Sequence, residues 1–397
     1  MDKKTIEDVQ MKGKRVFIRV DFNVPMDEDG NISDDRRIRS TLSSINYCID
    51  HGAKVVLASH LGRPKGKVRK EFSLAPVSRR LGRLLNKEVA FAPDCVGEKT
   101  RSMIDALEPG DVLLLENLRF YPGEEANDEA FAGALAEGVD IYVNNAFGTA
   151  HRAHASTYGI TRFVPVSVAG FLMKREIDYF EKVISDPVRP FAAILGGSKV
   201  SGKIGVIRNL IDRVDKIFVG GGMMFTFLKA AGYEVGRSIV EEEMIDLSRE
   251  VQRRAREKKV MFYLPIDVVV ADRIDAKANT KTVTFQEIPS DWYGLDIGPA
   301  TCRYFSLALQ GVKTVVWNGP MGMYELDPFS RGTTYIARSV ADCFATTIIG
   351  GGDTADAVNR AGEADNMTFI STGGGASLRL LEGKNLPGIE GLSDIDG

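Results

Sequence analysis

The sequence RVFIRVDFNVP occupies residues 15–25, where a short apolar run turns abruptly into a polar loop. The run Arg15–Val20 is rich in β-branched residues, which predicts a strand, and the loop begins at Asp21. Along the rest of the chain the same unit recurs: an apolar run, a polar or glycine-rich turn, and a helical pattern. Continuous apolar strands that alternate with helices indicate parallel sheets covered on both faces. The predicted fold class is therefore α/β with doubly wound parallel sheets.

Further strands are expected wherever such runs recur. In the first half of the chain they are Lys54–Ala58, Val112–Leu115 and Ile141–Val143. In the second half they are Phe191–Leu195, Lys216–Val219, Val260–Leu264, Thr314–Trp317, Thr347–Ile349 and Thr368–Ile370. A chain of 397 residues is too long for one ordinary hydrophobic core, so two such domains are expected.

The boundary between the domains is placed near Gly170. The segment Phe171–Ile184 has apolar residues at helical spacing, and Asp186-Pro187 and Arg189-Pro190 then stop the helix. We expect a first domain over residues 1–170, a connecting helix over 171–187 and a second domain over 188–375. Residues 376–397 are too few for a domain and could pack back on either half.

Composition excludes several classes of function. The net charge of −3 gives no reason to expect nucleic acid or an anionic membrane as partner. The polar start of the chain has no signal-peptide core, and no apolar run approaches the ~20 residues that span a bilayer. The four cysteines form no CxxC pair, which favours reduced thiols in a cytosolic protein.

Several loops of the first half bring Arg or His to the carboxyl ends of the strands. They are Asp21–Pro25 with Arg36-Arg37 downstream, Ser59–Pro64, Glu116–Phe120 and Asn144–His154. Ligands of open α/β sheets bind at this edge, and the planar fork of arginine suits carboxylate and phosphate. A single such arginine usually forms a surface ion pair. The agreement of separate loops predicts a site for a polyanionic ligand.

Strands of the second half end in glycine runs, at Gly196–Lys199, Gly220–Gly222, Gly350–Thr354 and Gly373–Ser377. Glycine lets the backbone approach a ligand, and N–H groups at a helix start favour phosphate, although one such run alone could be a tight turn. Residues Gly197–Lys203 match G-x-x-x-x-G-K, but Ile204 stands where a P-loop needs Ser or Thr. We interpret Gly196–Lys203 as a different phosphate site, with Lys199 and Lys203 one helical turn apart.

Acidic residues at three places in the second half have separate interpretations. Asp353 is a candidate magnesium anchor, and its structural role would be an N-cap for a helix that begins near Thr354; the two roles are not exclusive. Glu325 could accept from ribose hydroxyls or be a plain surface carboxylate. Glu241–Glu243 is interpreted as a solvated helix face without a function.

The segment Arg19–Pro25 resembles the signature of the phosphoglycerate kinase family. Other segments match in the family's order, from about residue 5 to the end: Ser59–Pro64, Glu116–Phe120, Ala150–Ala155, Leu195–Lys203, Val316–Gly322, Ile349–Ala355 and Ser371–Ser377. The resemblance implies two Rossmann-like domains joined by a helix and hinge, with the last residues returning to the N-terminal domain. It implies the glycolytic reaction 1,3-bisphosphoglycerate + ADP ⇌ 3-phosphoglycerate + ATP, with Mg²⁺.

Site residues carry over from the resemblance by motif. The acidic substrate is then expected at Asp21, Asn23, Arg37, His60, Arg63, Arg119 and Arg152. The nucleotide is expected at Lys199, Lys203, Gly294, Asn318, Glu325, Gly350, Gly351, Gly352, Asp353 and Thr354, with the adenine near Gly220–Gly222 and Gly294–Leu295.

Phosphoryl transfer needs alignment and neutralised charge more than covalent help from the protein. We expect Arg37, Lys199 and the N–H groups of Gly374 and Gly375 to supply this catalysis, with Mg²⁺ on Asp353. Hinge closure about the Phe171–Ile184 helix would unite the two ligands.

The sequence disfavours two rival classes of function. A nicotinamide-dependent dehydrogenase is disfavoured because the sequence has no G-x-G-x-x-G. A non-catalytic scaffold would have lost the residues that catalysis needs, yet they are present. We expect a cytoplasmic, monomeric kinase whose partners are its substrate and ATP or ADP.

Overall fold

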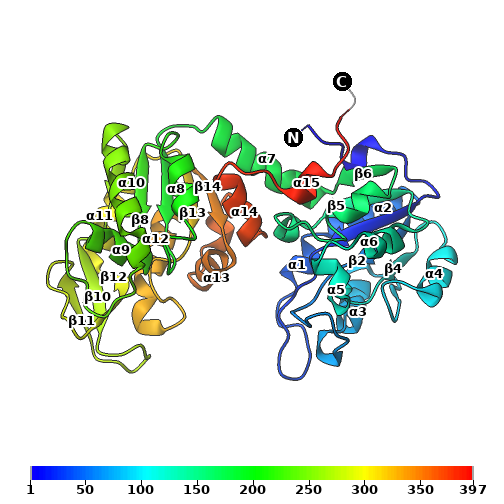
Figure 1. The fold of residues 1–397 in the computed structure, drawn as a ribbon, viewed down its shortest axis with the longest axis horizontal. Helices are drawn as coiled ribbons and strands as arrows, with labels where there is room; N and C mark the ends of the chain where they lie inside the picture. Colours follow the sequence, from blue (N-terminus) through cyan, green and yellow to red (C-terminus); the bar gives the residue numbers. More distant parts are fainter. Residues whose placement is uncertain (1, 396–397) are drawn as a thin grey trace. The chain divides into compact units, whose positions relative to one another are not determined.

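The strand β1 (Arg15–Val20) lies inside a six-stranded parallel sheet with the order β3-β4-β2-β1-β5-β6. The structure is a computed structural model that describes residues 2–395 (Figure 1). The neighbours of β1 are β2 (Lys54–Ala58) and β5 (Ile141–Asn145), and Arg19 pairs with Ala58 on one side and Asn144 on the other. The outer strands are β3 (Ala90–Phe91), β4 (Val112–Leu114) and β6 (Val166–Ala169).

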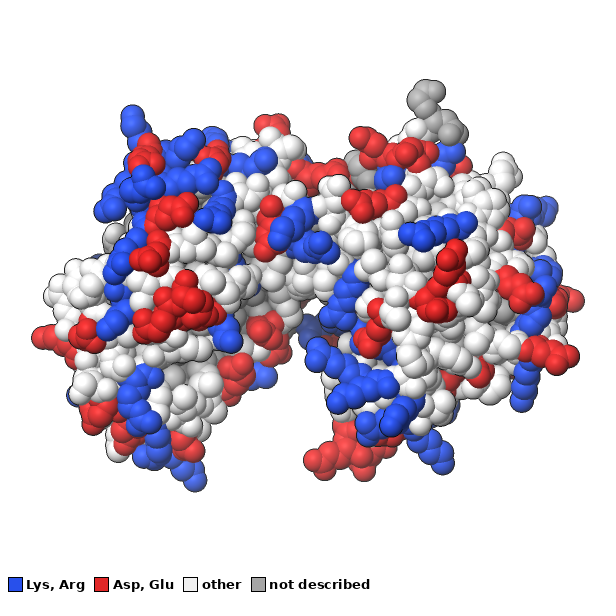
Figure 2. All heavy atoms as spheres, in the orientation of Figure 1, with Lys and Arg blue, Asp and Glu red and all other residues white. Residues whose placement is uncertain are grey.

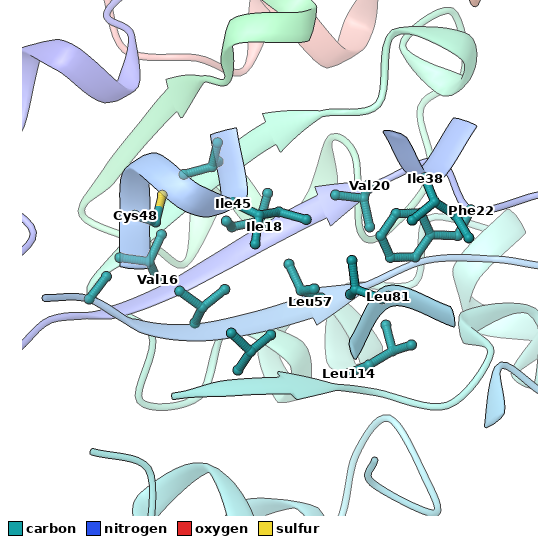
Figure 3. Packing of buried hydrophobic residues seen from close by; sticks show 14 of the residues in the cluster. Val16, Ile18, Val20, Phe22, Ile38, Ile45, Cys48, Leu57, Leu81 and Leu114 are labelled. Carbon is teal, nitrogen blue, oxygen red and sulfur yellow. The ribbon is translucent and has the colours of Figure 1, made fainter. Parts of the chain in front are cut away.

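Alternation along β1 divides its side chains between two faces of the sheet. Val16, Ile18 and Val20 belong to one buried cluster, which Figure 3 shows packed against Ile38 and Ile45 from the helices above them. Arg19 therefore points to the opposite face, and its side chain is also buried. A charged residue is thus built into the interior of the sheet.

A second parallel sheet has the order β15-β14-β13-β7-β8-β9. Its strands are β7 (Phe191–Leu195), β8 (Lys216–Val219), β9 (Met261–Tyr263), β13 (Thr314–Asn318), β14 (Thr346–Gly350) and β15 (Phe369–Ile370). In each sheet the chain order reverses beside the first strand, between β1 and β5 and between β7 and β13. Such a reversal opens a crevice at the carboxyl ends of the strands, where ligands of doubly wound folds bind. The predicted α/β fold class is confirmed.

Helices join the strands in both sheets. With the first sheet go α1 (Arg36–Arg39), α2 (Leu42–Asp50), α3 (Ala75–Leu85), α4 (Glu98–Asp105), α5 (Pro122–Glu125), α6 (Glu129–Ala136) and α15 (Pro387–Glu390). With the second go α8 (Ile204–Leu210), α9 (Met223–Ala230), α10 (Ile245–Glu257), α11 (Pro299–Leu309), α12 (Arg331–Ala341), α13 (Gly352–Arg360) and α14 (Gly374–Leu381). Short 3₁₀ helices occupy Ile6–Asp8, Lys70–Phe72, Leu118–Phe120, Phe147–Thr149, Gly159–Arg162, Glu242–Met244, Asp327–Phe329 and Ala364–Asn366.

An antiparallel sheet in the second half was not predicted. It has the order β11-β10-β12, with β10 (Asp267–Ala271), β11 (Thr280–Thr284) and β12 (Tyr293–Ile297). Most of β11 is exposed, and β12 contains a glycine and an aspartate, so neither strand has the apolar run that marks a buried parallel strand. The short strands β3 and β6 were missed as well.

The chain divides into two compact units. Unit 1 holds Met1–Asp178 and Asn385–Gly397, and unit 2 holds Tyr179–Lys384. The helix α7 (Phe171–Ser185) crosses from one unit to the other, so the boundary lies within the helix and not at residue 170. The expected boundary at residue 376 falls inside α14, which belongs to unit 2.

The last described residues lie against unit 1. The Asn144 side chain donates to the Gly388 carbonyl at 2.9 Å, and the Gly388 N–H donates to Ala150 at the same distance. Among the residues that the structure describes, no helix combines the length and the hydropathy that a bilayer crossing requires.

Candidate active site

An ion pair lies where β1 ends. Asp21 follows β1, and its carboxylate binds the guanidinium of Arg37 from α1. The other carboxylate oxygen lies 3.9 Å from Nδ1 of His60, which follows β2. The Phe22 N–H donates to the Ser59 hydroxyl at 2.8 Å, which ties the two loops together. The carboxyl ends of neighbouring parallel strands thus bring a carboxylate, an arginine and a histidine to one edge.

A second set of contacts centres on Gly62. Its N–H donates to Asn23 Oδ1 at 2.8 Å, and its carbonyl accepts from Arg119 Nη1 at 2.9 Å. Gly62 has a φ of 62°, and a Cβ there would lie 2.4 Å from the Phe72 ring. Only glycine can therefore join Asn23 and Arg119 at this point. Arg119 is itself buried and lies 3.2 Å from the carboxylate of Glu125.

The pKa of His60 reflects the charges of the arginines around it. Burial lowers the pKa of His60 well below its usual range, and the charges of four arginines lower it further: Arg19, Arg119, Arg37 and Arg152. The imidazole is therefore neutral at physiological pH. A concentration of guanidinium groups around a neutral histidine leaves a net positive site for an anion.

The remaining predicted arginines differ in their surroundings. Arg152 Nε lies 3.1 Å from His151 Nε2. Arg63 follows Gly62 directly, but its side chain is exposed and forms no hydrogen bond or ion pair with any residue between 2 and 395. The structure thus gathers Asp21, Asn23, Arg37, His60, Arg119 and Arg152, and leaves Arg63 extended from the same loop.

Arg19 was not predicted as part of this site. It is 1% exposed, and it donates from Nε to the Ser156 hydroxyl at 2.7 Å. Its Nη2 lies 3.2 Å from His60 Nδ1 and 3.9 Å from Glu124 Oε1. Glu124 in turn accepts from the Ser156 N–H and hydroxyl, at 3.0 and 2.6 Å. The available signal was a charged residue in the interior of a strand whose neighbouring positions, residues 16–18 and 20, are apolar.

In unit 2, glycine loops meet at the carboxyl ends of β7, β8 and β13. The Gly197 N–H donates to Pro320 at 2.9 Å, and the Gly221 N–H donates to Met321 at 2.8 Å. Gly319 has a φ of 98°, and a Cβ there would lie 2.2 Å from the Gly196 carbonyl oxygen. Close contact between the loops therefore requires glycine, as the sequence predicted for a backbone that approaches a ligand.

A cavity of about 390 Å³ opens beside these loops. Its lining includes Gly222, Tyr293, Gly294, Met323, Glu325 and Asp353. The guanidinium of Arg237 stacks on Tyr293 at 4.5 Å from the ring centre. An apolar wall with carboxylates at its edge suits a flat ring that carries a polar, charged tail. The antiparallel sheet supplies Tyr293 and Gly294, so the unpredicted strand β12 forms part of this cavity.

Lys203 and Asn318 lie side by side below the glycine loops. The Lys203 ammonium donates to Asn318 Oδ1. Burial lowers the pKa of Lys203 to about 8, although Asp353 and Glu382 oppose the shift. Asn318 Nδ2 is buried and has no acceptor among the residues that the structure describes. A buried donor without an acceptor costs free energy, which an incoming phosphate oxygen would recover.

The two lysines do not share a helix, contrary to the prediction. Lys199 lies in an irregular segment before α8, and Lys203 occupies the N-cap position of that helix. The Lys199 side chain is exposed, whereas that of Lys203 is largely buried. The segment turns because the Lys203 N–H donates to the Val200 carbonyl at 2.8 Å, which is turn and not helix geometry.

Two helix starts meet beside Asn318. Gly351, with a φ of 96°, is the N-cap of α13, and Gly373 is the N-cap of α14. A Cβ on Gly374 would lie 3.4 Å from the Gly352 nitrogen, so the two N-termini approach closely. Helix N-termini carry unpaired N–H groups and partial positive charge, and both favour phosphate.

The predicted role of Asp353 as an N-cap is wrong, because Gly351 holds that position and no side chain caps α13. Asp353 lies in the first turn, exposed, on the wall of the cavity. Thr354 is buried, and its hydroxyl accepts from the Gly319 N–H at 2.7 Å. The described residues contain no group of three or more His, Cys, Asp or Glu arranged to hold a metal ion.

The interpretation of Glu241 as a solvated residue is also wrong. Glu242 and Glu243 are exposed, but Glu241 is 9% exposed. Its carboxylate accepts from the Ser201 N–H and from the Ser201 hydroxyl. No local sequence pattern indicates this contact, because the two residues lie 40 positions apart.

An arginine-rich edge on one doubly wound unit and glycine-lined helix starts on the other are features of a two-domain phosphotransferase. A family model described as phosphoglycerate kinase matches residues 6–384. The chain is 60% identical over 384 residues to a phosphoglycerate kinase of Geobacter metallireducens, which covers 97% of this chain and 96% of that one. It is 59% identical over 384 residues to one of Geotalea uraniireducens, with the same coverage.

Solved structures agree with this likeness. Phosphoglycerate kinase from Coxiella burnetii superimposes with a TM-score of 0.86 at 41% identity over 98% of both chains. The enzyme from Pyrococcus horikoshii gives a TM-score of 0.85 at 32% identity, again over 98% of both chains. The chain belongs to the phosphoglycerate kinase family. It is an enzyme of glycolysis, and the predicted reaction, 1,3-bisphosphoglycerate + ADP ⇌ 3-phosphoglycerate + ATP, is confirmed.

Proposed function

We propose that unit 1 binds the phosphoglycerate and unit 2 binds the nucleotide of this reaction. The observation that carries the assignment is the cluster of cations at the carboxyl edge of the unit 1 sheet, where Arg37 pairs with Asp21 beside His60 and Arg119 donates to the Gly62 carbonyl. Such a cluster suits a small ligand with both a carboxylate and a phosphate. The cavity of unit 2 has the apolar wall and the paired helix starts that a purine nucleotide would use.

On unit 1, the guanidinium groups of Arg37, Arg119 and Arg152 bind the anionic groups of the substrate. The exposed Arg63 contributes a further guanidinium group. Asp21 and Asn23 have a different task, because a carboxylate does not attract an anion. Asp21 orients Arg37 through their ion pair, and Asn23 fixes the Gly62 loop that also positions Arg119. Asp21 and Asn23 can also accept from a substrate hydroxyl.

On unit 2, the adenine lies along the wall that contains Tyr293 and Gly294, and Glu325 accepts from the ribose hydroxyls. The phosphates reach Lys203, Asn318 and the N–H groups of Gly350–Thr354. Asp353 would hold Mg²⁺ together with phosphate oxygens, which fits the preference of this ion for one or two protein carboxylates. When bound, the ion neutralises charge on the nucleotide phosphates.

The transferred phosphoryl group moves between a carboxylate oxygen of the glycerate and the terminal phosphate oxygen of ADP. One phosphorus–oxygen bond breaks as the other forms, and no proton has to move. Arg37, Lys199 and the N–H groups of Gly374 and Gly375 neutralise the charge that spreads over the equatorial oxygens. A general base is not needed, which agrees with the lowered pKa of His60, because an imidazole whose pKa lies well below its usual range is a weak proton acceptor.

Ligands held on separate units have to meet for transfer, so we propose hinge closure that involves α7. Closure also excludes water, which would otherwise hydrolyse the phosphoryl donor. The glycolytic role of the family favours the cytoplasm as the place of action. We expect a monomer whose partners are phosphoglycerate and ATP or ADP, without nucleic acid or membrane.

The test is turnover of ATP with 3-phosphoglycerate and Mg²⁺, coupled to NADH oxidation by glyceraldehyde-3-phosphate dehydrogenase. Wild type is compared with Lys199→Ala. The control is Lys258→Ala, which removes an exposed lysine at the end of α10. A fall in kcat of at least about a hundredfold in Lys199→Ala alone, or about 2.7 kcal/mol of transition-state stabilisation, supports its role. Full activity in Lys199→Ala would remove Lys199 from the mechanism.

A further inference from the structure

A second group of arginines in unit 1 lies outside the residues assigned to the substrate. The helix α3 carries Arg79, Arg80 and Arg83 on the wall of a cavity of about 520 Å³. The loop that contains Gly30 and Asp35 forms the other wall. Figure 2 shows Lys and Arg side chains gathered on unit 1 near α1. None of the predicted substrate residues lines this cavity.

Two of these arginines have nothing to neutralise them. Arg79 and Arg83 are exposed, and neither side chain forms a hydrogen bond or an ion pair within residues 2–395. They lie one helical turn apart, where like charges destabilise a helix by a few tenths of a kcal/mol. Arg80 differs, because its Nε and Nη2 donate to Asp35 at 2.9 and 2.6 Å.

The carboxylates on the opposite wall do not cancel this charge, because other cations already neutralise them. Asp34 accepts from Arg36 Nε at 2.8 Å, and this contact lowers the pKa of Asp34. Asp35 accepts from Arg39 Nε at 2.8 Å as well as from Arg80, and the pKa of Asp35 is lowered by both arginines. The cavity therefore keeps an excess of positive charge.

We propose that this cavity binds a small polyanion, a metabolite with two or more phosphate or carboxylate groups. Arg79 and Arg83 contact the anion through their forks, and Arg80, held by Asp35, presents its remaining N–H groups. The cavity volume lies within the range that small-molecule sites occupy. The loop that lines it leads directly into α1, so the ligand lies next to the helix that carries Arg37.

The test uses inorganic pyrophosphate as the probe, titrated by calorimetry into the full chain at low salt without Mg²⁺. Pyrophosphate that binds the proposed substrate and nucleotide sites does so equally in every variant, so the differences between variants isolate the cavity. Arg79→Ala/Arg83→Ala is compared with Arg256→Ala/Arg303→Ala, which removes the same charge from two exposed arginines of unit 2 whose side chains pair with no residue in the described part of the chain. Arg79→Lys/Arg83→Lys retains the positive charges but lacks the guanidinium groups that bind an anion through two N–H groups.

The expected result is a binding event that is at least tenfold weaker in Arg79→Ala/Arg83→Ala, intermediate in the lysine variant and unchanged in the unit 2 variant. Equal binding in wild type and Arg79→Ala/Arg83→Ala would overturn the proposal, as would an equal loss in the unit 2 variant. A separate titration with 3-phosphoglycerate tests the substrate site, so failure of the two proposals can be told apart. Unchanged melting temperatures show that the variants are folded.

Discussion

The carboxylate of Glu241 forms two hydrogen bonds with Ser201. It accepts from the Ser201 N–H at 2.9 Å and from the Ser201 hydroxyl at 2.6 Å. Ser201 lies between Lys199 and Lys203, so these bonds fix the segment that carries both lysines. Burial would raise the pKa of Glu241, but the bonds from Ser201 and Val200 and the charge of Lys199 outweigh it and lower the pKa. Glu241 is therefore ionised and anchors residues 199–203, the segment that we propose binds the nucleotide phosphates.

Glu241→Gln should weaken nucleotide binding without touching the substrate side. The amide keeps the size of the carboxylate but replaces one acceptor with a donor, so one bond from Ser201 is lost. A hydrogen bond to a charged group contributes about 1.5–3 kcal/mol, so we expect about a tenfold or greater fall in kcat/KM for ATP. Steady-state kinetics should show an unchanged KM for 3-phosphoglycerate.

The matched control is Glu243→Gln, because Glu243 is exposed in the same segment. It should behave as wild type. Equal changes in both KM values for Glu241→Gln would indicate general destabilisation instead of loss of a positioned loop.

Nucleotide affinity should fall as pH rises through about 8, the value to which burial lowers the pKa of Lys203. The ammonium is the form that attracts phosphate, and it is present below this pKa and lost above it. The KM for ATP should therefore rise between about pH 7.5 and 9, whereas the KM for 3-phosphoglycerate stays level over that range. Bound phosphate raises the pKa, so kcat should titrate at higher pH than kcat/KM.

Lys203→Arg separates this effect from other titrations, since a guanidinium stays charged throughout the range. Its KM for ATP should be higher than that of wild type but independent of pH up to about 9. A pH dependence that survives in Lys203→Arg would assign the titration to another group.

Arg19 and Glu124 should depend on each other for stability. Both are buried, 3.9 Å apart, and share Ser156. Arg19→Met leaves the carboxylate of Glu124 buried without its cation, which typically costs about 3–5 kcal/mol. Urea unfolding, followed by a probe in unit 1, should show the loss directly.

The double variant Arg19→Met/Glu124→Gln removes both charges, so it should recover much of the stability that Arg19→Met loses. If the two single losses simply add in the double variant, the residues are not coupled.

The sequence predicted strands well where a buried apolar run was continuous. The bounds of β1, β2, β7 and β8 agree with the structure at both ends. It failed for β11, because an edge strand such as Thr280–Thr284 faces solvent and lacks that run. A pattern based on buried parallel strands cannot identify an exposed antiparallel one.

The residues of the candidate site likewise fall into two groups, those whose position could be predicted from the sequence and those whose position could not. His60, Arg119 and the glycine loops follow strands directly, so their place at the sheet edge could be predicted from the chain order. Arg19 and Glu241 could not, because their importance lies in partners 137 and 40 residues away. Pairings over such separations depend on how the loops pack, and the local sequence contains no information on that packing.

Hinge closure predicts a compaction that needs both ligands. In the proposed arrangement phosphoglycerate alone contacts only unit 1 and the nucleotide alone only unit 2, so neither should change the radius of gyration much. Both together should lower it, because the anion on one unit gains Lys199 and the helix starts of the other as partners.

Small-angle scattering of the wild type with no ligand, with each ligand and with both gives the comparison. Arg37→Ala is the informative variant, since it removes a cation from the substrate site while the nucleotide site is untouched. Compaction with ATP alone, or none with both ligands, would contradict closure as the step that unites them.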